Sequence, residues 1–123
     1  MWSDRYNYYN IQSDESYTGK VQTEIVLQLF LKSGNFLLKD HQTLVNADRF
    51  PWVEIVLVET KDGSFATSEK KLPYTNLIAV VCTKSANTDQ QVYLKTFLAI
   101  AEELNWKLYL EEDDEGNENI EIK

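Results

Sequence analysis

The chain has 123 residues, of which 43% are hydrophobic and 12% aromatic, and this content predicts one folded domain, residues 1–123, rather than disorder. Its 20 acidic and 12 basic residues give a formal charge of −8, which opposes nucleic-acid binding because that binding depends on cationic side chains. The chain has a single cysteine, which cannot form an internal disulfide and favours a reducing compartment. It also shows no leader with a basic and then apolar profile and no apolar stretch of about 18 residues, so we expect a cytoplasmic protein without a membrane segment.

The first third of the chain predicts a strand followed by a helix. Tyrosines alternate with polar residues along residues 5–13, which favours a strand because aromatic side chains suit a pleated surface. Good helix formers fill residues 20–34, and Gly34 stands where a left-handed helix cap is needed. Residues 35–50 are expected to be irregular. The helix side chains predicted to face the core are Ile25, Val26, Leu29 and Phe30.

The middle of the chain predicts a hairpin and a central strand. Residues 52–60, WVEIVLVET, form a β-branched run, and Asp62-Gly63 after it is a hairpin signal that predicts a short return strand over residues 64–67. The segment KKLPY is expected to be a loop because Pro73 withholds a ladder donor. Residues 76–84, NLIAVVCTK, are apolar on both faces, as expected for a strand at the middle of a sheet.

The last third predicts a second helix and a closing hairpin. Cap-type residues at 87–89 precede a helix over residues 90–106. Residues 107–111 alternate as a strand, and Gly116-Asn117 would turn the chain so that residues 119–122 pair back. The helix positions that recur at core-facing spacing are Tyr93, Phe97, Ile100, Ala101 and Leu104.

This order of elements predicts an α+β fold. It matches a ferredoxin-like mixed β-sheet with two main helices on one face and a C-terminal acidic hairpin. In the strand over residues 52–60, apolar side chains also fall on the second face, at Trp52, Val56 and Val58. An uncovered sheet face with a tryptophan and tyrosines invites a partner, either a second copy of this chain or another protein.

The closing segment carries seven carboxylates between Glu111 and Glu121, for which a metal site, a solvated turn and a surface for a basic partner are the alternatives. With Gly116 at the sixth position of a calcium loop, position twelve falls on Ile122, where a bidentate glutamate is required. The flanks are also not helical. We therefore expect no dedicated metal site, and the solvated turn and the basic partner remain as alternatives.

No catalytic or cofactor signature emerges from the sequence. The one histidine, His41, has no neighbouring nucleophile motif, and Cys82 sits in the apolar run LIAVVCT, where a thiol is inert. A zinc site needs three or four clustered ligands, and the four glycines stand singly rather than in a phosphate-binding loop. We therefore expect no enzyme, no catalytic residue and no cofactor. A pair of carboxylates meeting in space stays open as a third alternative.

Two aromatic residues are candidates for contact with a partner. Trp52 follows Phe50-Pro51 at the start of the clearest strand, where it either packs or contacts another protein. Strand alternation sends some tyrosines away from the helices, and Tyr109 in the last strand is one that could serve as an anchor. Trp106, between the second helix and that strand, is expected in the core.

Three segments between residues 50 and 112 carry a family resemblance: FPWVEIVLVETKDGSF, NLIAVVCTK and FLAIAEELNWKLYLEE. In this order and spacing they resemble small immunity proteins of bacterial polymorphic-toxin systems, of the contact-dependent inhibition type. The resemblance implies a non-enzymatic cytoplasmic protein that binds a cognate toxin domain and blocks its active site or substrate path.

The resemblance gives the acidic segment a purpose. A nuclease toxin with a basic active-site groove would be attracted by a carboxylate-rich, aromatic surface. The residues expected to bind it are Trp52, Tyr109, Glu111, Glu112, Asp113, Asp114, Glu115 and Glu118. The alternative function is a ferredoxin-like regulatory or scaffold domain that forms a homodimer through its open sheet face.

Overall fold

The computed structural model describes residues 6–60, 73–84, 88–113 and 115–123. Within them lie two helices, α1 (Thr23–Lys32) and α2 (Gln90–Leu104). The strands within them are β1 (Tyr6–Gln12), β2 (Val21–Gln22), β3 (Phe36–Asp40), β4 (Thr43–Asn46), β5 (Val53–Val58), β6 (Tyr74–Thr75), β7 (Leu77–Thr83), β8 (Lys107–Glu112) and β9 (Glu118–Ile122). The predicted α+β class is confirmed.

Seven of these strands form one sheet in the order β3-β4-β5-β7-β1-β8-β9, and β2 pairs with β6 in a separate small sheet. Every ladder between the described strands is antiparallel. The prediction of a mixed sheet is therefore wrong. Strands β1 and β5 do run in the same direction, but β7 lies between them and opposes both, so parallel strands are never neighbours.

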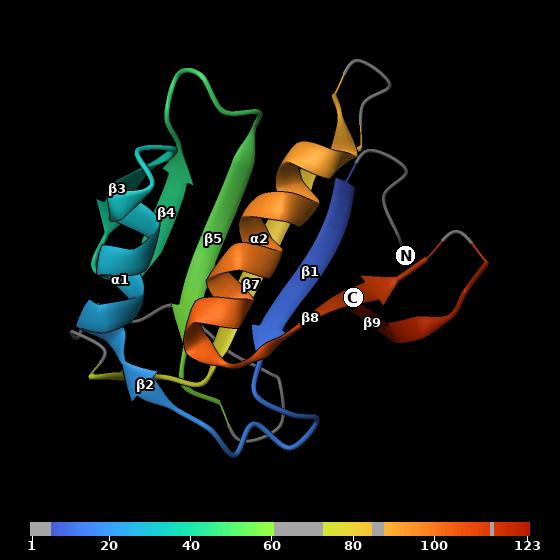
Figure 1. Cartoon of the computed structure of the whole chain (residues 1–123), viewed down its shortest axis with the longest axis horizontal. Coiled ribbons are helices and arrows are strands. Elements are labelled where there is room, and N and C mark those ends of the chain that lie inside the picture. Colours follow the sequence, from blue (N-terminus) through green and yellow to red (C-terminus); the bar gives the residue numbers. More distant parts are fainter. Residues whose placement is uncertain (1–5, 61–72, 85–87, 114) are drawn as a thin grey trace.

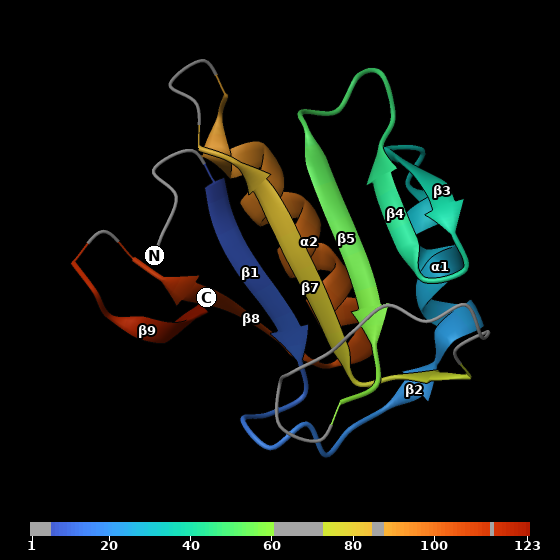
Figure 2. The same ribbon diagram turned by 180° about the vertical axis from the view of Figure 1, so that it is seen from behind.

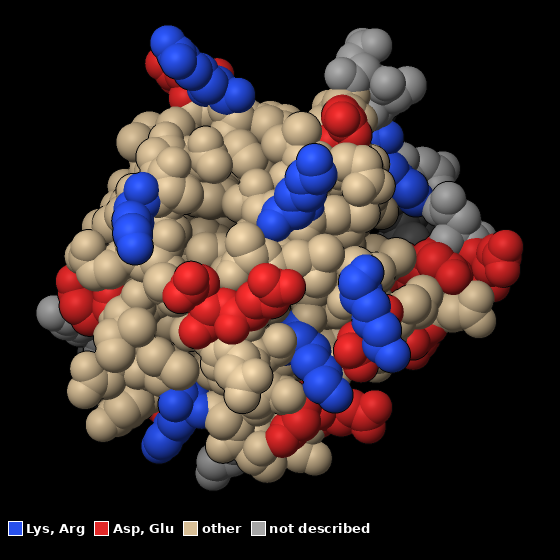
Figure 3. Space-filling model, in the orientation of Figure 1, with Lys and Arg blue, Asp and Glu red and all other residues tan. Residues whose placement is uncertain are grey.

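The two helices lie on one face of the large sheet and leave its other face uncovered. Figure 1 shows α2 in front of β7 and β1, with α1 in front of β3 and β4. In Figure 2, seen from behind, β5, β7 and β1 lie in front of α2 with no helix over them. On the helix-covered face, acidic and basic side chains are interspersed, and acidic ones gather at the end occupied by β8 and β9 (Figure 3).

The core lies between the helices and the sheet and is unusually aromatic. Phe97 of α2 is fully buried, and its ring centroid lies 6.5 Å from that of Tyr9, 6.4 Å from that of Phe36 and 6.2 Å from that of Tyr93. Phe36 in turn contacts Phe30 of α1 edge-on at 5.2 Å. One connected group of rings therefore joins both helices to the sheet.

The second helix forms where the sequence predicted it, with a clear cap at each end. The Asp89 carboxylate accepts a hydrogen bond from the Gln91 N–H at 2.9 Å, which satisfies one of the free donors of the first turn. Asn105 adopts a left-handed conformation and ends the helix at Leu104, two residues before the predicted end. Four of its five predicted core residues are buried, namely Tyr93, Phe97, Ile100 and Ala101.

The first helix is shorter than predicted. It begins at Thr23 because Val21 and Gln22 pair with Thr75 and Tyr74 of β6, and Tyr74 belongs to the segment predicted as a loop. Its buried residues are Thr23, Val26, Leu27 and Phe30, whereas Ile25 is 48% exposed, contrary to its predicted place in the core. Gly34 has a φ of 79°, which confirms the predicted left-handed residue after the helix.

Residues 35–50, predicted to be irregular, contain β3 and β4. These strands extend the sheet beyond β5, and Leu44 of β4 is fully buried opposite Ile55. Sequence patterning missed them because both strands are short and their polar residues hide the alternation.

Residues 76–84 give β7, which lies between β5 and β1 as predicted for a central strand. The predicted turn at Asp62-Gly63 and the strand over residues 64–67 lie outside the described residues. No helix in the described part of the chain is long and apolar enough to cross a membrane.

Phe97→Ala tests the aromatic core. Truncating a fully buried phenylalanine should lower the free energy of unfolding by about 3–5 kcal/mol, because a cavity replaces its ring contacts. Leu37→Ala, at a side chain that is 54% exposed, is the control and should change stability by less than about 0.5 kcal/mol. Urea unfolding monitored by circular dichroism measures both. Equal effects of the two substitutions would contradict this account of the core.

Candidate functional site

The candidate site lies on the uncovered face of the large sheet, and strand alternation determines which side chains reach it. In β1, Tyr9 and Ile11 are buried beneath the helices, so Tyr8 and Asn10 point to the opposite side. In β5 the same alternation buries Ile55 and leaves Glu54 and Val56 on the uncovered side.

The register of the ladders brings these side chains into rows across the strands. One row runs from Glu54 through Val81 to Tyr8. The next runs from Val56 through Ala79 and Asn10 to Tyr109. The uncovered face therefore has an apolar centre on β7, with polar and acidic side chains on the strands beside it.

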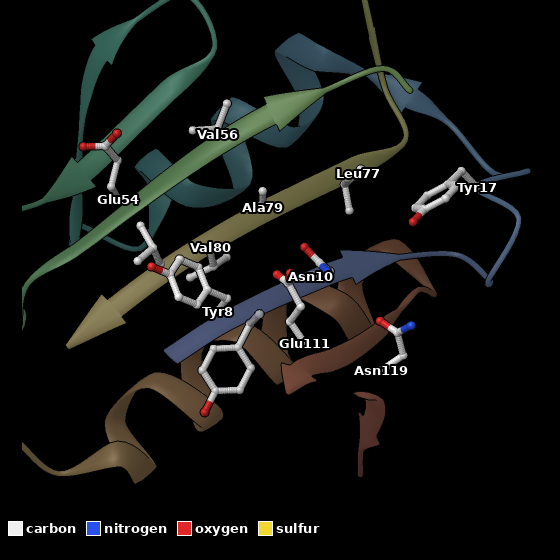
Figure 4. A pocket seen from close by; sticks show the side chains of 12 residues that line it. Tyr8, Asn10, Tyr17, Glu54, Val56, Leu77, Ala79, Val80, Glu111 and Asn119 are labelled. Carbon is white, nitrogen blue, oxygen red and sulfur yellow. The ribbon is translucent and has the colours of Figure 1, made fainter. Parts of the chain in front are cut away.

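A hollow of about 390 Å³ lies on this face (Figure 4). Its floor is formed by Val56, Leu77 and Ala79, which come from the central strands β5 and β7. In Figure 4 the side chain of Glu111 stands near the middle of the lining, and the Tyr17 hydroxyl points toward it. The other labelled polar side chains around the hollow are Tyr8, Asn10, Glu54 and Asn119.

The carboxylate of Glu111 is the chemically distinctive group in the hollow. It is half-buried, and no hydrogen bond or ion pair reaches it from any residue that the structure describes. Burial, followed by the nearby carboxylates of Glu112 and Glu118, raises the pKa of Glu111. Its negative charge is thus partly desolvated and close to other carboxylates, and no described residue stabilises it with a positive charge.

The second carboxylate of the hollow, Glu54, differs because it already has a cationic partner. Its Oε2 lies 3.5 Å from Lys39 Nζ of β3. The register places Tyr8 opposite both Val81 and the position of Glu111, so Glu54 and Glu111 are three strands apart, about 14 Å between backbones.

Two further hollows share lining residues with the first one and lie toward β8 and β9. One of about 200 Å³ is lined by Gln12, Glu15, Tyr17, Tyr109 and Asn119. The other, of about 490 Å³, contains Asp14, Glu121 and again Tyr109 and Asn119. Asn119 borders all three hollows and has a φ of 51°, the left-handed region. The hollows together form a groove along one side of the uncovered face.

Trp52 and Tyr6 lie at the other end of this face. The Trp52 side chain is 45% exposed, and its ring centroid lies 5.4 Å from that of Tyr6, which is also exposed. The Trp52 carbonyl accepts a hydrogen bond from the buried Tyr93 hydroxyl at 2.6 Å. The core therefore fixes the backbone of Trp52 while its ring remains available to a partner.

The structure separates the predicted acidic residues instead of gathering them. Strand alternation places Glu111 on the uncovered face, whereas Glu112 pairs with Glu118 on the side of Leu108 and Leu110. Glu115 is exposed at the turn, and Asp114 lies outside the described residues. The predicted binding residues therefore belong to at least two different surfaces.

Asp113 has a structural role in the turn between β8 and β9. Its Oδ1 accepts hydrogen bonds from the N–H groups of Glu115 and Asn117, both at 2.9 Å, and its Oδ2 accepts one from the Asn117 side chain. These bonds, led by the one from the Asn117 side chain, lower the pKa of Asp113. The carboxylate is thus already engaged within the turn.

Tyr109 is buried, with 7% of its surface exposed, although it borders the two further hollows. Little of its area is left for a partner to cover. Tyr8 was among the tyrosines that alternation could turn away from the helices, but sequence reasoning missed Asn10, Tyr17, Glu54 and Asn119. The alternation of residues 5–13 would have placed Tyr8 with Asn10, but Tyr17 lies in a loop, where no periodicity indicates its direction.

Among the described residues, the one cysteine is buried and no group of side chains is placed to hold a metal ion. Burial raises the pKa of Cys82 to about 12, so its thiol stays protonated and unreactive. Across residues 6–60, 73–84, 88–113 and 115–123, no three His, Cys, Asp or Glu side chains are grouped to hold a metal ion. No protein-family model matches the chain, and no curated protein matches it.

Glu111→Gln should stabilise the protein at neutral pH. Because the folded-state pKa of Glu111 is raised, its ionised form destabilises the folded state at pH values above that pKa. This cost disappears below the unfolded-state pKa of about 4.3, so the gain in melting temperature should be present at pH 7 and absent near pH 4. Thermal unfolding across this pH range measures it.

Glu121→Gln is the matched control, since it removes the same charge from a carboxylate that lies 3.7 Å from Lys107 Nζ. It should give no such gain. An equal rise in both variants would mean that the effect comes from net charge and not from the surroundings of Glu111.

Asp113→Ala should loosen the turn between β8 and β9. Faster amide hydrogen exchange at Glu115 and Asn117 is expected, because both N–H groups lose their acceptor. Asp113→Asn keeps an acceptor oxygen and should retain most of the protection. The lowered pKa of Asp113 means that its contribution is present above about pH 3.9 and is lost as the pH falls through its folded-state pKa. Unchanged exchange in Asp113→Ala would contradict this role.

Proposed function

We propose that this chain is a non-enzymatic binding protein that occludes a basic partner protein through the uncovered face of its sheet. The observation that carries the proposal is a sheet covered by helices on one side only. Its other side has an apolar centre, a groove containing carboxylates, and an exposed Trp52-Tyr6 pair. Such a combination is typical of interfaces, where aromatic anchors and a polar rim surround an apolar centre.

The charge of the chain favours a basic partner. A formal charge of −8 speeds encounter with a cationic surface and repels nucleic acids and other acidic molecules. Glu15, Glu54, Glu111 and Glu121 all border the groove, so the same sign of charge appears where contact is proposed. Exposed residues at the turn, such as Glu115, would add to the attraction at longer range.

We infer from the family resemblance that the partner is a bacterial toxin domain and that the chain is its immunity protein. A nuclease toxin has a basic groove for its substrate, which an acidic and aromatic surface would fill. The chain would then act in the cytoplasm of the cell that makes it, by stoichiometric binding rather than turnover.

A ferredoxin-like unit within the fold is part of this proposal. The four strands in the order β5-β7-β1-β8, antiparallel throughout, together with α1 and α2 on one face, support it. Strands β3 and β4 at one edge and β9 at the other would be additions. They widen the uncovered face on both sides.

The rival function, self-association through the same face, is disfavoured by charge. Two copies meeting at this face would bring the unpaired Glu111 carboxylates and the other groove carboxylates of both chains together, which costs energy. A basic partner removes that cost.

Val81→Lys tests the proposed face. Val81 lies at its centre, in the row between Glu54 and Tyr8, and a buried lysine there should weaken capture of the partner about thirtyfold or more, the loss expected at a binding hot spot. The immobilised chain is exposed to extracts of its own source, and bound proteins are identified by mass spectrometry. Affinity is then measured with the purified partner at low and high salt.

Val92→Lys is the matched control, because Val92 is exposed on α2, in the helix layer. The Val92→Lys variant should bind the partner with an affinity within twofold of the unchanged chain. Its co-expression with the captured toxin should also restore growth of the toxin-producing cells. Equal binding by both lysine variants would overturn the proposed face. A salt-insensitive homodimer with no partner would support the scaffold function instead.

A further inference from the structure

We propose that the hollow of about 390 Å³ is a receptor for one arginine side chain of the partner protein, with Glu111 as the residue that receives it. This inference rests on the proposed function and specifies the chemistry of its central contact. The size of the hollow is at the lower end of the roughly 300–1,000 Å³ of ligand sites, which suits a single long side chain better than a folded segment.

The acceptors in the hollow match a guanidinium. Arginine carries five N–H donors and no acceptor, so a receptor for it must supply oxygens. The free carboxylate of Glu111 can take two of these donors in the forked geometry of arginine-carboxylate pairs. The side chains of Asn10 and Asn119 stand beside it in Figure 4 and can offer their amide oxygens to the remaining donors.

The aromatic side chains select arginine over lysine. Tyr8 and Tyr17 border the hollow on different sides of Glu111. A flat guanidinium stacks on such rings and is only weakly hydrated, whereas an ammonium is a strongly hydrated point charge that forms no fork. The apolar floor of Val56, Leu77 and Ala79 would contact the methylene stem.

One cation fits the hollow because, of the carboxylates that line it in the described part of the chain, only Glu111 is without a partner there. Glu54 already has Lys39 at 3.5 Å, and its backbone lies about 14 Å from that of Glu111, too far for one guanidinium to bridge. Glu111, by contrast, has no cation within the described part of the chain. Its raised pKa, caused first by burial, shows how poorly its charge is stabilised in the empty hollow.

Asn119 connects the hollow to the neighbouring ones, because it borders all three. Its φ of 51° lies in the left-handed region, which asparagine adopts more readily than most residues. An extended partner segment could continue from the arginine into the two further hollows.

The test uses N-acetyl-arginine amide as the probe, titrated into the full isotope-labelled chain and followed by NMR. Shifts are expected in the side-chain amides of Asn10 and Asn119 and in the rings of Tyr8 and Tyr17. N-acetyl-lysine amide should bind at least about tenfold more weakly, and the citrulline analogue, which is neutral, should not bind. Equal binding of the lysine and arginine probes would overturn the assignment.

Glu111→Gln should weaken the arginine probe at least tenfold, while Glu102→Gln, which removes an equal charge from an exposed position of α2, should change it less than twofold. Because Glu111→Gln is expected to keep or increase stability, a loss of binding cannot be attributed to unfolding. Unchanged binding in Glu111→Gln, or shifts confined to other parts of the surface, would overturn the proposal.

The failure of this inference is distinguishable from failure of the proposed function. If the partner still depends on Val81 but is indifferent to Glu111→Gln, the uncovered face binds the partner and the arginine receptor is wrong. If Val81→Lys and Val92→Lys bind the partner equally, the proposed face itself is wrong, whatever the probe does.

Discussion

The packing of aromatic rings between the helices and the sheet is the interaction on which the rest of the structure depends. Phe97 contacts Tyr9, Phe36 and Tyr93, and Phe36 continues the contact to Phe30 of the first helix. All of these rings lie on the same side of the sheet. Both helices are therefore held on one face, and neither of them covers the opposite face.

The uncovered face takes its character from this one-sided core. Where a strand directs one residue toward the rings, it directs the next toward solvent, so Tyr9 in the core implies Tyr8 and Asn10 outside. The face is both apolar and acidic because Val81 and Ala79 of the central strand lie between Glu54 and Glu111. Folding leaves the Glu111 carboxylate there without a cation among the described residues, so a cationic partner that binds this face can stabilise its charge.

The sequence determined the local elements with the strongest patterns. The spacing of Tyr93, Phe97, Ile100 and Ala101 predicted a helix and its buried face. The helix depends on hydrogen bonds within its own segment, and its buried face is one apolar stripe, so both can be recognised locally. The continuous apolar run of β7 similarly predicted a central strand. Weak patterns failed, since β3 and β4 are short and are stabilised by pairing with β5, a partner distant in sequence.

The tertiary structure alone decided the site. Composition showed many carboxylates, and alternation along the strand separates Glu111 from Glu112, but only the pairing of β8 with β1 places Glu111 in the hollow beside Tyr8. Asp113 is occupied by the turn, a contact that depends on the local path of the backbone. The sequence thus determined how much negative charge the protein carries, whereas long-range strand pairing decided which carboxylate lies in the hollow without a partner among the described residues, because register depends on neighbours that no local pattern reveals.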